Sequence, residues 1–319
     1  MGLFNPIKGR KKMKKILFTL LLLPFLSQAQ QESYYSLYQY NMQVINPAYA
    51  GAEAENMISF LNRTQWQTLD DSPRTMAMAF SSKRENNVGL GLSVVADKVF
   101  VERQTFAYVD FSYKLDLTDQ TRVYLGLKAG GNFYRSSSLN LEDYNTGVDP
   151  AQKEFSRFNP NVGAGMYLQN EKYWLSLSVP RLFNVRRDDE ISIGAKDRIH
   201  AYMGGGFKIA LNDVINIKPS VMFRKVKALP LSTDLTSFIS FQDRIDLGLS
   251  YRSNAAMSLM VFVNVVNGID IGYAYETPSD SSLAAQNIQT HEIFFRIRLG
   301  QTAKTQEAQE ESTGGPMNQ

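Results

Sequence analysis

Cysteine is absent from the 319-residue sequence, and histidine occurs only twice, at His200 and His291. The lack of cysteine excludes disulfide bonds, thiolate metal sites and redox chemistry at sulfur. The two histidines are far apart in the sequence and do not have the spacing of a zinc-binding pair on a helix. We therefore expect no metal, no other cofactor and no metal-dependent enzyme activity.

A nucleophile elbow and a phosphate-binding loop are also missing. The glycines at 89 and 91, at 163 and 165 and at 204–206 lack the Lys-Ser/Thr of a phosphate loop. We interpret them as positions that allow bending, close packing or room for large neighbours. A serine hydrolase built across strands, or a lipid-modifying enzyme with His200 or His291 beside a serine, is a weakly supported alternative.

The N-terminus has the three parts of a secretory signal peptide. Six basic residues between positions 8 and 15 precede the apolar residues 16–26 and then Ser27-Gln28-Ala29. We predict cleavage after Ala29, and a retained membrane anchor is disfavoured because the apolar part is too short to span a bilayer as a helix. Since Met13-Lys14-Lys15 resembles a start, residues 1–12 are interpreted as an over-long gene start.

Charge gives no reason to expect a nucleic-acid partner. The formal net charge of the whole chain is +3, and residues 1–29 contain six basic and no acidic residues. The mature chain would therefore carry a net charge of −3, so the alkaline character comes from the signal peptide.

Apolar residues alternate with polar or small residues through almost the whole mature chain, as at residues 122–133. This period of two is typical of a strand with one face toward lipid and one toward a wet interior. About fourteen such segments are expected, at residues 57–65, 74–81, 88–95, 104–115, 122–134, 161–169, 173–179, 200–210, 215–225, 229–238, 244–252, 256–264, 269–276 and 290–299. The pattern predicts an all-β protein, a transmembrane antiparallel up-and-down outer-membrane β-barrel.

Short and long connections between these segments alternate. Tight turns rich in Asn, Asp and Gly lie at 83–87, 118–120, 170–172, 212–213, 242–243 and 267–268, whereas residues 136–158, 180–198 and 278–289 form long connections. Outer-membrane barrels have short periplasmic turns and long extracellular loops. We therefore predict both termini in the periplasm, the barrel at residues 57–300, an aromatic periplasmic segment at 30–56 and a disordered periplasmic tail at 301–319.

Charged residues on the phase opposite the apolar face are expected to point into the lumen, because a charge facing lipid is costly. They are Asp110, Lys114, Lys128, Arg224, Asp246, Arg252, Asp270, Glu276, Arg296 and Arg298. Their mixed sign favours an interior ion-pair network over a selective pore. Aromatics near strand ends are interpreted as interface anchors: Tyr113, Phe133, Tyr134, Tyr167, Tyr173, Trp174, Tyr251, Tyr273 and Tyr275.

A sequence motif between the predicted signal peptide and the first predicted strand resembles that of a known family. Residues 40–51 read Tyr-Asn-x-x-x-x-Asn-Pro-Ala-Tyr-Ala-Gly, and residues 63–66 read Arg-Thr-Gln-Trp before a turn that contains Pro73. With the closing Thr-His-Glu-Ile at 290–293, the sequence resembles the PorP/SprF family of Bacteroidota outer-membrane proteins over residues 30–300. The first phrase is fairly specific, whereas the strands alone are not.

The resemblance implies a non-enzymatic component of the type IX secretion and gliding-motility machinery. Its partners would be outer-membrane lipid, an exported surface protein such as an adhesin with a C-terminal secretion domain, and a periplasmic machinery protein or peptidoglycan-binding lipoprotein. The extracellular loops would hold the exported protein, while the aromatic segment would contact machinery or plug the lumen. A passive porin for small solutes is the alternative.

Candidate partner-binding or motif residues are taken from the two phrases. They are Tyr38, Asn46, Pro47, Tyr49, Gly51, Arg63, Gln65 and Trp66. An equally supported interpretation gives them a structural role, in which they order the entry of the first strand and the inner rim.

Overall fold

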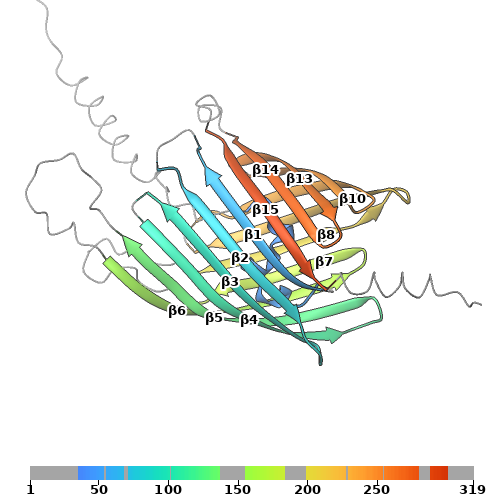
Figure 1. Ribbon diagram of the computed structural model, residues 1–319, viewed down its shortest axis with the longest axis horizontal. Helices are drawn as coiled ribbons and strands as arrows, with labels where there is room; N and C mark the ends of the chain where they lie inside the picture. Colours follow the sequence, from blue (N-terminus) through green and yellow to red (C-terminus); the bar gives the residue numbers. More distant parts are fainter. Residues whose placement is uncertain are drawn as a thin grey trace, which may run out of the picture. The chain divides into compact units, whose positions relative to one another are not determined.

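Antiparallel strands form one closed sheet in the computed structural model (Figure 1). The structure describes residues 35–53, 55–67, 71–100, 102–136, 155–183, 199–227, 229–253, 255–279 and 288–300, which belong to a unit that begins at Tyr35. Apart from β8 and β9, which both pair with β10, each strand pairs with its neighbours in sequence, and β15 pairs with β1 from Asn56↔Leu299 to Gln65↔Thr290. This last pairing closes the barrel.

The strand bounds agree closely with the alternating segments of the sequence. The strands are β1 (Asn56–Gln65), β2 (Arg74–Lys83), β3 (Val88–Val99), β4 (Glu102–Asp116), β5 (Thr121–Ser136), β6 (Phe155–Asn170), β7 (Tyr173–Arg181), β8 (His200–Phe207), β9 (Ile209–Ala210), β10 (Ile215–Val226), β11 (Ser232–Phe241), β12 (Ile245–Arg252), β13 (Ala256–Val266), β14 (Ile269–Pro278) and β15 (Thr290–Leu299). Because β8 and β9 both pair with β10 and continue one another, the described part of the barrel has fourteen strands. The predicted fold class and strand number are confirmed.

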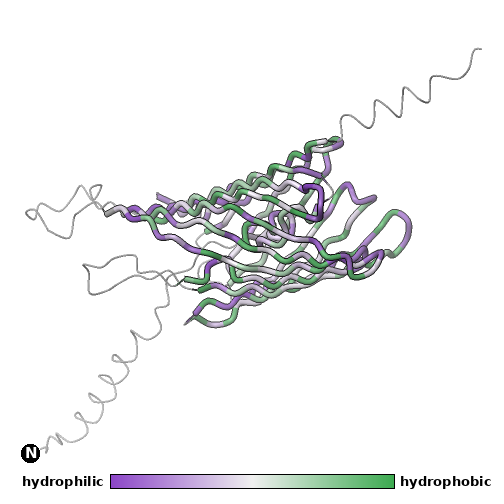
Figure 2. Tube along the Cα trace, turned by 90° about the horizontal axis from the view of Figure 1, so that it is seen from below, coloured by the Kyte–Doolittle hydropathy of each residue, from purple (hydrophilic) through white to green (hydrophobic). Residues whose placement is uncertain are grey.

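The alternation of side chains separates an apolar outer wall from a polar lumen. Leu127 is 63% exposed, whereas its neighbour Lys128 is 2% exposed and points inward. Figure 2 shows the same alternation of hydrophobic and hydrophilic residues along the strands. An outward apolar face and an inward polar face are what a lipid-embedded barrel requires.

The connections at one end of the barrel are short, as predicted. They join β2 to β3, β4 to β5, β6 to β7, β9 to β10, β11 to β12 and β13 to β14. The predicted loop at 136–158 is shorter than expected, since β6 begins at Phe155 and pairs with the end of β5. Residues 137–154, 184–198 and 280–287 lie outside the described residues, as do the predicted signal peptide at 1–29 and the predicted tail at 301–319.

Residues 35–53, here called the lumen segment, contain the short helices η2 (Tyr38–Tyr40), α2 (Met42–Ile45) and η3 (Pro47–Tyr49). These helices lie between the front and back strands of the barrel in Figure 1. Leu37, Asn46 and Ala48 have no measurable exposure, so the segment is enclosed rather than laid on a surface. In the part of the chain that the structure describes, helices are too short for a membrane span.

Two of the predicted interface aromatics face the lumen instead. Tyr134 and Tyr167 are each 6% exposed, and Tyr167 packs against the lumen segment. Trp174 also packs partly against this interior cluster. The prediction was wrong at these positions because nearness to a strand end was given more weight than the inward phase of the residue.

Candidate functional site

Glycines in the lumen wall give the lumen segment its space. A Cβ atom at Gly126 would lie 2.1 Å from the backbone nitrogen of Ala48, and one at Gly89 would lie 2.1 Å from the carbonyl oxygen of Ala50. A Cβ at Gly165 would lie 2.0 Å from Oδ1 of Asn46. Any side chain at Gly89 or Gly126 would collide with backbone, so these strands are fitted to the segment.

Gly51, near the end of the segment, has a conformation that glycine tolerates best. Its φ is +69°, and a Cβ there would lie 2.7 Å from the Cα of Gly89. The Gly51 amide donates a 2.8 Å hydrogen bond to Oγ of Ser81 on β2. The positive φ and the close approach together explain why the motif has glycine at this position.

Asn46 fixes the centre of the lumen segment to two neighbouring strands. Its Oδ1 accepts a hydrogen bond from the Ala48 amide at 2.9 Å and so caps η3, in which Pro47 occupies the first position. Its Nδ2 donates to the Met166 carbonyl at 3.0 Å and to Oγ of Ser176 at 2.8 Å. The side chain of Asn46 therefore forms hydrogen bonds both within the lumen segment and to the barrel wall.

A buried lysine binds the other side of the segment. Nζ of Lys128 lies 3.3 Å from Oδ1 of Asp110 and donates to the carbonyls of Gln43 and Val44 in α2, at 3.3 and 3.1 Å. Gln43 in turn donates to Oδ2 of Asp110 at 3.0 Å. A cation is favourable where the last carbonyls of a helix lack partners, so the wall charge and the segment backbone complement each other.

Arg63 organises a charged cluster near the opposite end of the barrel, where the long connections lie. Its guanidinium is 2.6 Å from Oε1 of Glu276 and 3.2 Å from Oε2 of Glu292. Arg252 binds the second oxygen of Glu276 at 3.1 Å and also Asp234 at 2.8 Å. All five side chains are buried or nearly so, and the pairing offsets part of the desolvation cost.

The lumen segment supplies the donors that this cluster lacks. Within this cluster two guanidinium groups face three carboxyl groups, so Glu276 and Glu292 share Arg63. The backbone amides of Ser36 and Leu37 donate to the two oxygens of Glu292 at 2.9 and 2.8 Å, and Oγ of Ser36 donates to Glu276 at 3.1 Å. The cluster is therefore completed by residues 36–37.

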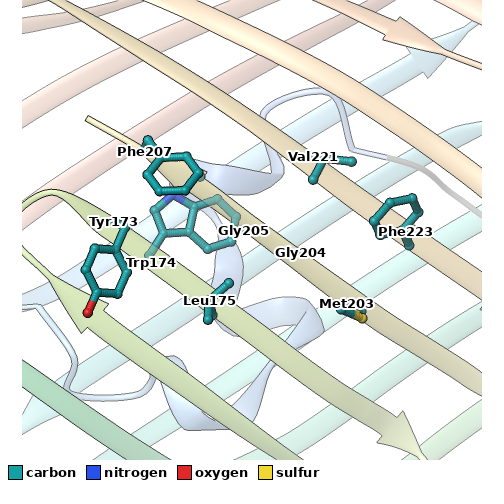
Figure 3. Close-up of a pocket in the computed structure, with 10 residues that line it drawn as sticks. Tyr173, Trp174, Leu175, Met203, Gly204, Gly205, Phe207, Val221 and Phe223 are labelled. Atoms are coloured by element: carbon teal, nitrogen blue, oxygen red, sulfur yellow. The ribbon is translucent and has the colours of Figure 1, made fainter. Parts of the chain in front are cut away.

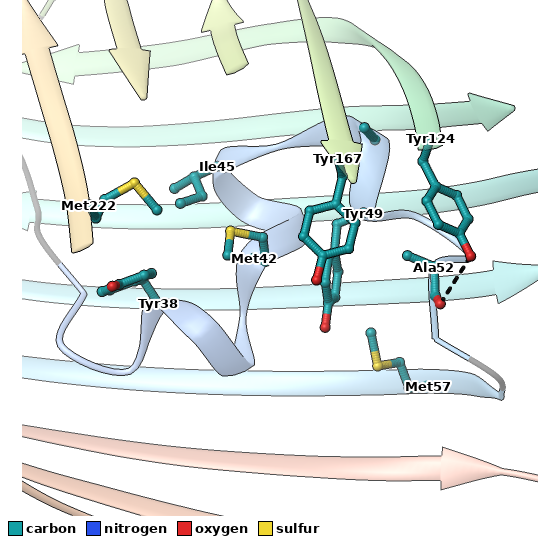
Figure 4. Packing of buried hydrophobic residues seen from close by; sticks show 10 residues of the cluster. Tyr38, Met42, Ile45, Tyr49, Ala52, Met57, Tyr124, Tyr167 and Met222 are labelled. Carbon is teal, nitrogen blue, oxygen red and sulfur yellow. Dashed lines mark hydrogen bonds between the residues drawn. The ribbon is translucent and has the colours of Figure 1, made fainter. Parts of the chain in front are cut away.

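Tyrosines fill the remaining space between the segment and the wall. Tyr49 packs edge-to-face on Tyr167 at 5.0 Å, and Tyr124 donates to the carbonyl of Ala52 at 3.4 Å (Figure 4). Burial, together with the nearby carboxylate of Glu53, raises the pKa of Tyr49 well above 10. Tyr49 therefore stays a neutral donor to Glu53.

Tyrosines in the first half of the segment contact strands β10, β12 and β13 through hydrogen bonds and ring stacking. The ring of Tyr40 stacks on Phe262 at 3.7 Å, and its hydroxyl donates to Asp246 at 2.6 Å. The hydroxyl oxygen of Tyr38 is 3.3 Å from Oγ of Ser220 on β10. Contacts with β2 to β7, β10 and β12 to β15 place the segment across the lumen and not along one side.

Most of the predicted motif residues meet in this site. Tyr38, Asn46, Pro47, Tyr49 and Gly51 belong to the lumen segment, and Arg63 binds the carboxylates that hold its beginning. Gln65 and Trp66 stand apart at the end of β1, where Trp66 is 41% exposed with a φ of +54°. The backbone N–H of Gln65 donates to the Pro73 carbonyl at 2.9 Å, and this bond orders the connection to β2.

Sequence reasoning missed Ser36, Gln43 and Glu292 as parts of the site. Glu292 lies within the closing phrase at 290–293, and its inward phase opposite Arg63 was a usable signal. Ser36 and Gln43 had no such signal, because their partners lie on strands distant in sequence. The predicted ion-pair network itself is confirmed at Asp110–Lys128, Arg252–Glu276 and Asp270 with Arg296 and Arg298.

The two histidines are on opposite faces of the wall. His200 is fully buried on the lumen side, whereas Nδ1 of His291 is 2.7 Å from the Tyr273 hydroxyl on the outer face. Within the described ranges, no three His, Asp or Glu side chains are grouped so that they could hold a metal ion.

Replacement of Asn46 by alanine should lower the free energy of unfolding by about 2 kcal/mol, because it removes a helix cap and leaves buried partners unsatisfied. Urea titration in lipid vesicles measures the change. Asn46→Asp should retain the cap but lose the donor, and Asn62→Ala on the exposed outer wall should change stability by less than about 0.5 kcal/mol. Equal effects at positions 46 and 62 would contradict this role.

The family model for type IX secretion system membrane protein PorP/SprF matches residues 27–297. A comparison with curated proteins finds no match.

Among solved structures, the Acinetobacter baumannii outer membrane protein Omp33 is 8% identical, with 78% of this chain and 100% of that chain covered and a TM-score of 0.45. The CymD monoaromatic hydrocarbon channel is 12% identical, with 79% and 90% covered and a TM-score of 0.45. A mutant porin of Rh. blastica is 9% identical, with 76% and 98% covered and a TM-score of 0.33.

Proposed function

Since the chain belongs to the PorP/SprF family of type IX secretion system membrane proteins, we propose that it is a closed barrel that docks an exported surface protein or assists its secretion. The protein is located in the outer membrane, in which its apolar wall faces lipid. A barrel without free edges gives such a docking role a rigid base.

The filled lumen is the observation that carries this proposal. The lumen segment is bound to strands around the barrel, and the Glu292 carboxylate accepts two of its backbone amides. A diffusion porin needs an aqueous path of adequate width, and a buried segment at this level opposes one. The same feature favours a role in which partners bind at the rims of the barrel.

The partners follow from the family and from the two ends of the barrel. An exported protein with a C-terminal secretion domain would bind the extracellular loops, most of which lie outside the described residues. A periplasmic machinery protein or peptidoglycan-binding lipoprotein would bind at the short turns. Neither role requires enzymatic chemistry, so we propose a non-enzymatic protein.

Replacement of residues 137–154 by a short Gly-Ser linker should release the exported protein from the cell surface while the barrel still assembles. Surface immunolabelling of the exported protein and heat-modifiable gel mobility of the barrel are the two readouts. An equally short replacement of the turn at 117–120 is the control for barrel assembly. Normal surface retention after the loop replacement, together with normal retention after replacement of residues 184–198, would contradict docking through these loops.

A further inference from the structure

An apolar hollow of about 430 Å³ lies on the outer wall of the barrel, over β7, β8 and β10. Its volume is within the range of small-molecule sites. Figure 3 shows the residues around it. Large side chains on the outer face are Tyr173, Leu175, Met203, Phe207, Val221 and Phe223, and Trp174, which packs partly against the interior cluster, also lines the hollow. Met203 and Phe207 are 57% and 62% exposed, so the hollow opens toward the membrane.

Gly205 produces the hollow. It pairs with Leu175 on β7 and with Val221 on β10. In this row of three paired residues, the central position has no side chain and both of its neighbours have a large one. A Cβ at Gly205 would meet Cδ2 of the outward Leu175 at 2.8 Å. The adjacent Gly204 and Gly206 face the lumen, where a Cβ would meet Met222 and Trp174, and so they serve a different purpose.

The distance between the strands on either side of Gly205 limits the size of the ligand that the hollow can hold. Neighbouring strands are about 4.8 Å apart, so the backbones that flank Gly205 are separated by roughly 10 Å. The side chains of Leu175 and Val221 narrow this space further. An α-helix with its side chains is about 10–12 Å across and does not fit, whereas a single hydrocarbon chain does.

A cation lies at the rim of the hollow. Tyr173 and Phe207 pair at the end with the short turns, and the next residues are joined by a 2.7 Å hydrogen bond from the Lys208 amide to the Lys172 carbonyl. Nζ of Lys208 is bound to Asp243 at 2.8 Å. Lys172 is exposed and has no ion-pair partner among the described residues, so it can attract a phosphate group.

We propose that this hollow is a site for one phospholipid, with an acyl chain over Gly205 and the phosphate group beside Lys172. Van der Waals contacts between the acyl chain and the apolar side chains of the hollow hold the chain, since lipid tails are as apolar as these side chains, and Lys172 fixes the depth of the headgroup. If the short turns face the periplasm, the lipid belongs to the periplasmic leaflet.

A phospholipid with a photoactivatable diazirine on one acyl chain tests the site in reconstituted vesicles. The proposal predicts cross-links concentrated on peptides containing residues 173–177, 203–207 and 221–223, compared with the exposed wall at Leu249 and Leu259. Met203→Trp, which fills the hollow from its surface, should reduce this labelling by about tenfold, since roughly ten lost carbon–carbon packing contacts account for that factor. Leu249→Trp is the matched control and should leave it unchanged.

Lipid retained through detergent purification, counted by native mass spectrometry, gives a second readout. One phospholipid should remain on the wild-type protein, and both Met203→Trp and Lys172→Glu should lose it. Uniform labelling around the barrel, or retention that is unaffected by Met203→Trp, would overturn the proposal. Because neither readout involves an exported protein, failure of docking would leave this result unaffected.

Discussion

Arg63→Ala should destabilise the barrel by about 3–5 kcal/mol, the usual cost when one partner of a buried ion pair is removed. Among the described residues, the substitution would leave Glu276 with Arg252 alone and Glu292 without an ion-pair partner. Since Glu292 also holds the amides of Ser36 and Leu37, the beginning of the lumen segment should loosen as well. Urea unfolding in lipid vesicles measures the first effect, and protection of the Ser36 and Leu37 amides from hydrogen exchange measures the second.

Two variants separate this effect from a general loss of charge. Lys98→Ala breaks an exposed pair with Asp71 and should cost less than about 1 kcal/mol. Arg63→Lys keeps the charge but cannot present two guanidinium nitrogens to Glu276 and Glu292. The free energy of unfolding of Arg63→Lys should therefore lie between those of the wild type and Arg63→Ala. Similar stability of Arg63→Ala and Lys98→Ala would show that the cluster does not hold the segment.

Removal of residues 35–51 should convert a barrel that conducts no sustained current into one that does. The deletion leaves the inward Lys128, Glu276 and Glu292 facing an empty lumen, which water can then enter. A barrel of fourteen strands without its filling is wide enough for an aqueous path. Current across a planar lipid bilayer measures the change.

A second variant covers the case in which the deletion prevents assembly. Gly126→Leu places a side chain where the backbone of Ala48 lies and should displace the segment, with the same gain of current. Gly205→Leu makes the identical exchange on the outer wall and should leave the barrel closed. Sustained current through the wild-type protein would favour the porin alternative, and no current through either opened variant would show that the segment does not close the lumen.

The barrel was predictable because a period of two needs no information beyond the strand itself. Val123, Leu125 and Leu127 alternate with inward residues, and the cost of a charge in lipid then assigns Lys128 to the lumen. The same rule applied to β6 puts Tyr167 in phase with the inward Gly165 and so predicts its true position. The error at Tyr167 therefore came from the interpretation and not from a lack of signal.

The path of the lumen segment could not be derived in the same way. Its helices are three or four residues long and have no periodicity, and no local rule aims them at a wall. The bond between Ser36 and Glu292 joins residues 256 positions apart, and Asn46 reaches Ser176 across 130. The glycines at 89, 91 and 165 gave the one indication, since room for a large neighbour was expected there without its identity.

A disulfide between Ser36→Cys and Ser258→Cys tests most directly whether the lumen segment fills the barrel. The two hydroxyl oxygens are 3.4 Å apart, and the natural chain has no cysteine that could compete. Our account predicts that both thiols of the folded protein disappear on mild oxidation and that the cross-linked barrel stays closed to ions. Two thiols that remain open to a water-soluble maleimide in the folded, membrane-embedded protein would contradict it.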